Sequence, residues 1–145
     1  MKRHVFLLLA LAACTHAAPP SAGIPQSGGE VSPRKAVESF LGAVRAQDLQ
    51  AMSLIWGTEK GPARDVVDRA QLEKRELIMQ CYLGHDKFQI LSDTPQRAEI
   101  HKLQVSLSKG SITRETTFTT VRGPRDRWYV QDAELEPVRD LCATP

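Results

Sequence analysis

The sequence lacks several features that mark large classes of proteins. Its N-terminal apolar run, residues 5–13, is too short to cross a bilayer of about 30 Å as a helix. The excess of positive charge is only +2, which argues against a general nucleic-acid binder. No glycine-rich phosphate loop, Walker motif or serine elbow occurs. What remains is a chain of 145 residues, 41% hydrophobic and 25% charged, which fits one globular domain.

The first residues have the pattern of a secretory signal. Lys2 and Arg3 precede the apolar run, and small residues follow it. The segment Leu11-Ala12-Ala13-Cys14 resembles the lipobox of bacterial lipoproteins. The resemblance implies that residues 1–13 are removed and that acyl chains are attached to the Cys14 sulfur and to the new amino terminus. Two or three such chains make a durable membrane anchor.

The lipoprotein resemblance also predicts a location. Thr15 stands where an Asp favours retention in the inner membrane, so the pattern implies a protein of the cell envelope on the periplasmic face of the outer membrane. Cleavage removes Lys2 and Arg3 from 19 basic residues, which leaves 17 against 17 acidic residues and no net charge. Electrostatic attraction to nucleic acid therefore has little support.

A linker is predicted between the anchor and the domain. Residues 14–31 are rich in Pro, Gly, Ala and Ser and contain no aromatic residue, so this segment cannot bury enough apolar surface to order itself. We therefore divide the chain into a signal over residues 1–13, a lipidated flexible linker over 14–31 and a folded domain over 32–145.

Helical periodicity dominates the first half of the domain. Ser32 followed by Pro33 is a helix-start signal, and Asp48 is suited to cap a second, short helix that ends near Gly57. A loop is expected over residues 57–62 and a third helix over 63–83. The apolar face expected for this third helix consists of Val66, Val67, Ala70, Leu77, Ile78, Cys81 and Tyr82.

The hydrophobic period then changes from 3.6 to 2. Strands are expected around Phe88 and Ile90, around Leu103, over residues 112–121 and over 128–135, with turns at 109–111 and 123–126. Three N-terminal helices followed by an antiparallel sheet of about four strands make an α+β domain. Alternating burial along the strands indicates that one face of the sheet is exposed to water.

The remaining two cysteines leave two alternatives. In an oxidising envelope compartment Cys81 and Cys142 are suited to form a disulfide, and otherwise they are two buried free thiols. A metal site is not expected, because His85 and His101 show no paired ligand spacing.

Two stretches resemble the nuclear-transport-factor-2-like superfamily. One is Pro33 followed by Ala36-Val37-Glu38-Ser39-Phe40-Leu41, with Asp48-Leu49 and Met52 behind it, and the other is Arg127-Trp128-Tyr129-Val130 with Asp132. The resemblance implies a cone in which three N-terminal helices pack on a curved antiparallel sheet. It also implies a pocket between the helices and the concave sheet face. Its motifs concern fold, and no catalytic residue is carried over from it.

Five residues are candidates for the lining of that pocket. They are Trp56, Tyr82, His101, Trp128 and Asp132. By strand parity His101 shares a face with Leu103, where it could act as an acid or base or bind a ligand, or simply form the rim of the cone. Asp132 has the parity of Trp128, so it would lie on a mostly apolar face and need a partner such as Arg. Trp56 and Tyr82 could equally be core residues.

Three functions are compatible with these features. The leading hypothesis is a membrane-anchored envelope lipoprotein whose domain is a non-catalytic module for a small ligand or a protein. The alternative is a small pocket enzyme, an isomerase or hydrolase, that uses His101 or Asp132. A third is a structural subunit of an envelope complex. We assign no catalytic residue, cofactor or metal, and the expected partners are the membrane, through Cys14, and an unidentified small ligand or envelope protein.

The lipobox gives a direct prediction. The protein isolated from its native cells should lack residues 1–13 and carry the added mass of two or three acyl chains on Cys14, as measured by intact mass spectrometry. Recovery of the uncleaved chain with a free Cys14 thiol would contradict the proposed topology.

Overall fold

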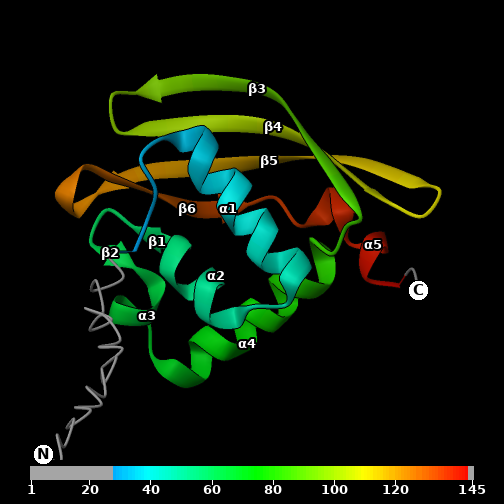
Figure 1. The fold of residues 1–145 in the computed structure, drawn as a ribbon, viewed down its shortest axis with the longest axis horizontal. Helices are drawn as coiled ribbons and strands as arrows, with labels where there is room; N and C mark the ends of the chain where they lie inside the picture. Colours follow the sequence, from blue (N-terminus) through cyan, green and yellow to red (C-terminus); the bar gives the residue numbers. More distant parts are fainter. Residues whose placement is uncertain (1–27, 144–145) are drawn as a thin grey trace, which may run out of the picture.

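A computed structural model describes residues 28–143, so Cys14, the signal and most of the linker lie outside the described part. Figure 1 shows its helices and strands. Their bounds are α1 (Pro33–Ala46), α2 (Leu49–Ile55), β1 (Gly57–Thr58), β2 (Gly61–Pro62), α3 (Ala63–Val66), α4 (Arg69–Tyr82), β3 (Lys87–Arg97), β4 (Ile100–Lys109), β5 (Ile112–Gly123), η1 (Pro124–Asp126), β6 (Arg127–Ala133), η2 (Glu136–Val138) and α5 (Asp140–Ala143). No helix in this part combines the length and apolar character needed to cross a membrane.

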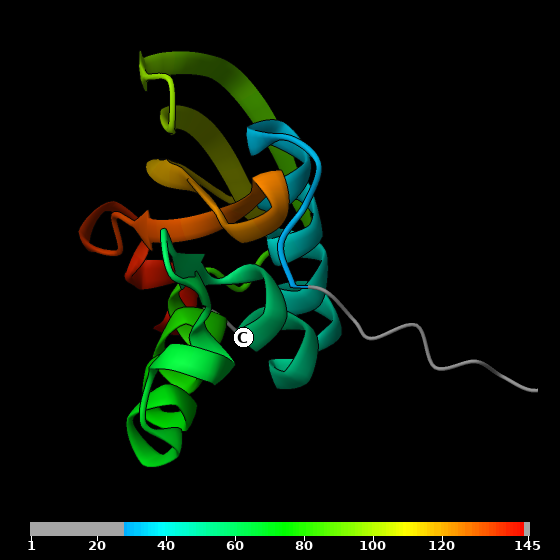
Figure 2. The same cartoon turned by 90° about the vertical axis from the view of Figure 1, so that its left-hand side faces the viewer.

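The predicted α+β class and the antiparallel meander are confirmed. The four long strands follow one another in the order β3-β4-β5-β6, each antiparallel to its neighbour. The sheet is strongly curved (Figure 2), and its register shifts between Ile90 and Ser92 in β3 and between Thr119 and Thr120 in β5. Such bulges increase local twist and bend a strand. The expected loop over residues 57–62 is instead a short hairpin of β1 and β2.

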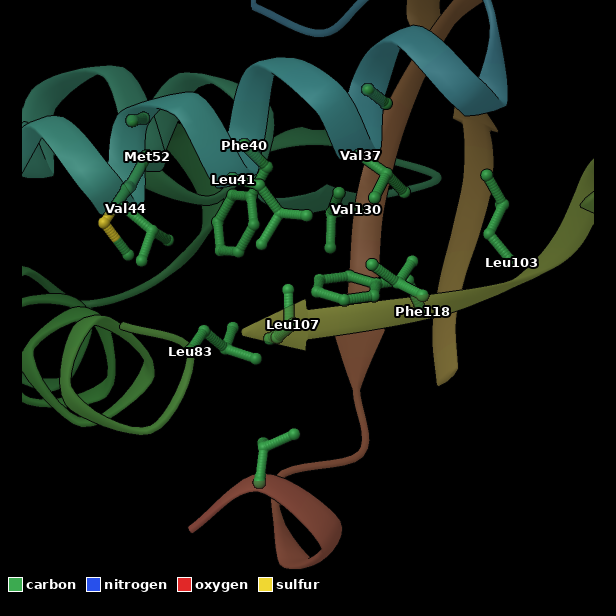
Figure 3. Packing of buried hydrophobic residues seen from close by; sticks show 14 of the residues in the cluster. Val37, Phe40, Leu41, Val44, Met52, Leu83, Leu103, Leu107, Phe118 and Val130 are labelled. Atoms are coloured by element: carbon green, nitrogen blue, oxygen red, sulfur yellow. The ribbon is translucent and has the colours of Figure 1, made fainter. Parts of the chain in front are cut away.

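Helix α1 covers the concave face of the sheet. Its N-terminus is capped as predicted, because the Ser32 hydroxyl accepts a hydrogen bond from the Lys35 backbone N–H at 3.2 Å and Pro33 opens the helix. Phe40 meets Phe118 of β5 edge to face, with 6.4 Å between ring centroids. Figure 3 shows the side chains of α1 directed at those of the sheet. The fully buried members of this core include Val37, Phe40, Leu41, Val44, Met52, Leu83, Leu103, Val105, Leu107 and Phe118.

The region expected to be a third helix is two helices. It breaks at Val67 and Asp68, because the Asp68 carboxylate accepts hydrogen bonds from the backbone N–H groups of Ala70 and Gln71 and starts α4 afresh. The break changes which face is buried. The expected face is wrong: Leu77 is 53% exposed, whereas Glu76 is only 3% exposed. The description of three N-terminal helices on the sheet is therefore corrected to four, with α2, α3 and α4 beside the sheet rather than across it (Figure 1).

The folded domain begins before residue 32. The Gly29 N–H donates to the Leu54 carbonyl at 2.8 Å, and Glu30 forms a β-bridge with Trp128. The Tyr129 hydroxyl donates to the Gly28 carbonyl at 3.1 Å. Residues 28–31 therefore pack on the edge of β6 and are not part of a flexible linker.

The predicted disulfide between Cys81 and Cys142 is confirmed. It joins the last turn of α4 to α5 across a sequence separation of 61 residues. Lys109 at the end of β4 adds a second link, because its ammonium group donates to the Leu141 carbonyl at 3.0 Å. The C-terminal segment is thereby fixed against α4 and one end of the sheet.

Loss of this disulfide should destabilise the domain. In the chain-entropy model, closing a loop of this length lowers the conformational entropy of the unfolded chain. The folded state is thereby stabilised by about 4 kcal/mol. The Cys81→Ser, Cys142→Ser double variant should therefore unfold at a clearly lower urea concentration than the oxidised protein. Reduction of the wild type with dithiothreitol should reproduce that shift. Equal midpoints for oxidised and reduced protein would contradict the stabilising role.

Candidate functional site

Two of the predicted pocket residues, His101 and Trp128, lie together at one end of the concave sheet face. Their rings meet edge to face with 5.0 Å between centroids. Asp93 of β3 holds His101, with 2.6 Å between the carboxylate Oδ1 and the ring Nδ1. The Arg122 guanidinium lies over the Trp128 ring, 5.1 Å from its centroid. The result is a polar rim beside the apolar core side chains of the same face, such as Leu103 and Phe118.

The structure places the other three candidates elsewhere. Trp56 caps the C-terminus of α2, and its indole Nε1–H donates to the Gln131 carbonyl at 3.3 Å, which ties α2 to β6. Tyr82 is half-buried at the end of α4, beside the disulfide. Both positions are consistent with structural roles.

The parity argument for Asp132 is wrong. Asp132 is exposed and pairs with Thr119, while Val130 pairs with Thr120. The bulge at Gln131 inserts one residue between these pairs and moves Asp132 to the opposite face from Val130. His101 pairs with Thr120 and so shares a face with Val130. His101 and Asp132 therefore lie on opposite faces of the sheet.

The largest cleft among those described lies outside the cone, where α1, α4 and β4 meet. Its volume is about 370 Å³, within the range of small-molecule sites. The lining residues are Val44, Arg45, Gln47, Leu77, Gln80, Cys81, Gly84, His85 and Lys109. Two of them are basic and none is acidic. We call this hollow the His85 cleft.

His85 gives the His85 cleft its chemical character. Only 6% of the residue is exposed. Its Nδ1 lies 2.8 Å from the Leu83 carbonyl, which can only accept, so Nδ1 carries the proton and Nε2 is left as an acceptor. Nε2 is buried and has no hydrogen-bond partner. Burial lowers the pKa of His85 and outweighs the hydrogen bond to the Leu83 carbonyl, which raises it; Arg45 lowers the pKa and Asp86 raises it to smaller extents. The net lowering favours the neutral ring.

A second cleft lies between α2, α3 and α4. It has a volume of about 250 Å³ and is lined by Gln50, Ser53, Arg64, Arg69, Leu72 and Glu76. We call it the Glu76 cleft. Glu76 is 3% exposed, and its Oε1 has no partner. Burial, reinforced by the negative charge of Glu73, raises the pKa of Glu76 to about 7.

Neither His85 nor Glu76 was assigned a site role from the sequence. In the continuous helix expected over residues 63–83, Glu76 lies outside the predicted apolar face. If Asp68 is taken as the cap of a new helix, the buried face of that helix can be assigned again. Leu72 and Glu76 are four residues apart, so they lie on one side of α4.

Within residues 28–143 no three His, Cys, Asp or Glu side chains gather as a metal site would require.

Comparisons with known proteins add little about the site. No family model and no curated protein matches the chain. Among solved structures, the chain is similar to an NTF-2 like protein of unknown function from Shewanella oneidensis MR-1. The TM-score is 0.45 and the identity 14%, over 69% of this chain and 92% of the other. The similarity concerns the course of the chain and assigns no residue a role.

The raised pKa of Glu76 predicts a pH-dependent stability. The folded state holds the proton that the unfolded chain loses near pH 4.5, so the contribution of this carboxyl to folding declines as pH rises from about 4.5 to about 7. The Glu76→Gln variant has no ionisable group at this position, so its free energy of unfolding should not decline in this way. The decline that it avoids is up to about 3 kcal/mol. Its urea midpoint should rise relative to wild type between pH 4 and pH 8.

The matched control for this measurement is Glu115→Gln, which removes an exposed charge from β5. Its midpoint should follow that of the wild type at every pH. If Glu76→Gln also followed the wild type in parallel, Glu76 would not be held protonated by the fold.

Proposed function

We propose that this protein is a lipid-anchored module of the bacterial cell envelope, attached through Cys14 to the periplasmic face of the outer membrane. The lipobox supports the anchor. We further propose that the domain is a nuclear-transport-factor-2-like module, which its α+β order and curved meander support.

We propose a non-catalytic role for the domain, with the His85 cleft as its ligand site. The observation that carries this proposal is the buried, unpartnered Nε2 of His85. A buried acceptor without a partner costs free energy, which a bound donor would recover. In the nuclear-transport-factor-2-like resemblance the pocket lies under the concave sheet face, but here that space is occupied by core side chains such as Phe40 and Leu103.

The lining of the His85 cleft selects a class of ligand. The Arg45 guanidinium places a positive charge at its rim, so an anion is favoured. Nε2 requires an O–H or N–H group on the ligand. A small carboxylate that also carries a hydroxyl or an amide N–H satisfies both, and a volume of about 370 Å³ suits a metabolite of that size.

Catalysis by His101 and Asp132 together is not part of the proposal, since a substrate cannot reach opposite faces of one sheet at once. His101 alone has the orienting carboxylate that a general base uses, in Asp93. The enzyme alternative therefore depends on His101 and Asp93, beside Trp128, and not on Asp132.

Acetate and glycolate, which differ by one hydroxyl, form a test pair for the His85 cleft. Isothermal titration of the mature lipidated chain in non-ionic detergent should show that glycolate binds about fivefold more tightly, the worth of one added hydrogen bond. The variant His85→Phe keeps a ring against Phe88 and should abolish that preference. Equal binding of both acids by the wild type, or a preference retained by His85→Phe, would contradict the assignment.

Arg45 and Arg34 provide a charge-matched control, since both are exposed arginines of α1 and only Arg45 lines the cleft. Arg45→Ala should weaken acetate and glycolate alike, by roughly threefold, the scale of an exposed ionic contact. Arg34→Ala should change neither affinity. Equal effects of the two substitutions would mean that the anion is attracted by overall charge and not by this cleft.

A further inference from the structure

The Glu76 cleft has a feature that the proposed function does not use. Its charged side chains are of two kinds: an acidic one, which favours a cationic ligand group, and basic ones, which favour an anionic ligand group. Glu76, buried on α4, presents a carboxyl oxygen without a partner, whereas Arg64 on α3 and Arg69 on α4 present guanidinium groups. Leu72 forms an apolar patch on the same wall.

The arginines do not neutralise Glu76. The structure shows no ion pair between Glu76 and either of them, and Arg64 is instead within 3.5 Å of the Asp65 carboxylate. A guanidinium in contact with Glu76 would lower the pKa of that carboxyl. The pKa is raised, and its causes are burial and Glu73 alone. The two kinds of group therefore occupy separate parts of the cleft.

We propose that the Glu76 cleft binds a small zwitterion, with its amine on the Glu76 carboxylate and its carboxylate or phosphate on Arg64 and Arg69. An ammonium group supplies the donor that Glu76 lacks, in a charge-assisted hydrogen bond. A volume of about 250 Å³ is below that of most drug-sized sites and suits a molecule the size of an amino acid or of phosphoethanolamine.

Ligand and proton should compete for Glu76. An ammonium binds the ionised carboxylate, so a ligand that enters below pH 7 displaces the proton of Glu76. Besides Glu76, the charged groups that line the cleft are Arg69 from α4 and Arg64 from α3, while α2 contributes the neutral Gln50 and Ser53. Glu73 lines an adjoining hollow, together with Arg69 and Glu76. Binding should therefore release close to one proton per ligand at pH 6 and almost none at pH 8.5.

The experiment uses isothermal titration of the mature lipidated chain in detergent, with β-alanine and O-phosphoethanolamine as probes. Acetate lacks the amine and ethanolamine lacks the anion, and each should bind at least tenfold more weakly than the better zwitterion. Tighter binding of β-alanine would indicate an amino acid as the natural ligand, and tighter binding of O-phosphoethanolamine a lipid headgroup. Absence of saturable binding by both zwitterions would overturn the proposal.

Variants locate the binding. Glu76→Gln keeps the shape of the side chain and should weaken the better zwitterion at least tenfold and abolish proton release, measured in two buffers of different ionisation enthalpy. Arg69→Ala should weaken it to a similar degree without changing proton release. If zwitterion binding and proton release were both unchanged in Glu76→Gln, the site would lie elsewhere.

Matched controls exist for both substitutions. Arg75 lies on the same helix as Arg69, is exposed and does not line the cleft, and Glu115 is an exposed carboxylate of β5. Arg75→Ala and Glu115→Gln should bind as the wild type does. Arg45→Ala, which alters the His85 cleft, should also leave zwitterion binding unchanged, so the two clefts are tested independently.

Discussion

The packing of α1 into the concave face of the sheet is the interaction on which the rest of the structure depends. One stripe of this helix packs on the apolar side chains of the sheet, and the contact between Phe40 and Phe118 is part of it (Figure 3). Protein interiors are close-packed, so a space filled by buried side chains in this way leaves little room for a ligand. The face that would form a pocket in an open cone is here the hydrophobic core. The clefts large enough for a small molecule that are described above lie instead at the perimeter.

The two perimeter clefts share a physical signature. Each contains one titratable side chain that is more than nine-tenths buried and has a polar atom without a partner, Nε2 in His85 and Oε1 in Glu76. Buried polar atoms in folded proteins are nearly always hydrogen-bonded, so an exception next to a cleft calls for an explanation, and a bound ligand is the one proposed above. Arginine side chains line both clefts. The disulfide between Cys81 and Cys142 fixes one wall of the His85 cleft.

The sequence was informative where local chemistry decides the outcome. The caps Ser32 and Asp48 and the meander of four strands could be predicted because each depends on neighbouring residues. The orientation of Asp132 could not, because a single bulged residue reverses strand parity. The inward position of Glu76 was missed because the break at Asp68 changes the phase of α4. Tertiary packing decided both cases.

Chemical-shift mapping tests most directly whether ligands bind at the perimeter rather than in the cone. Isotope-labelled protein would be titrated with glycolate while its backbone amide signals are followed. The account predicts saturable shifts concentrated at Arg45, Gln47, Gly84 and His85, with the amides of Leu103 and Phe118 unmoved. Shifts centred on Leu103 and Phe118 would show that the sheet face opens to ligand, and that result would contradict the account.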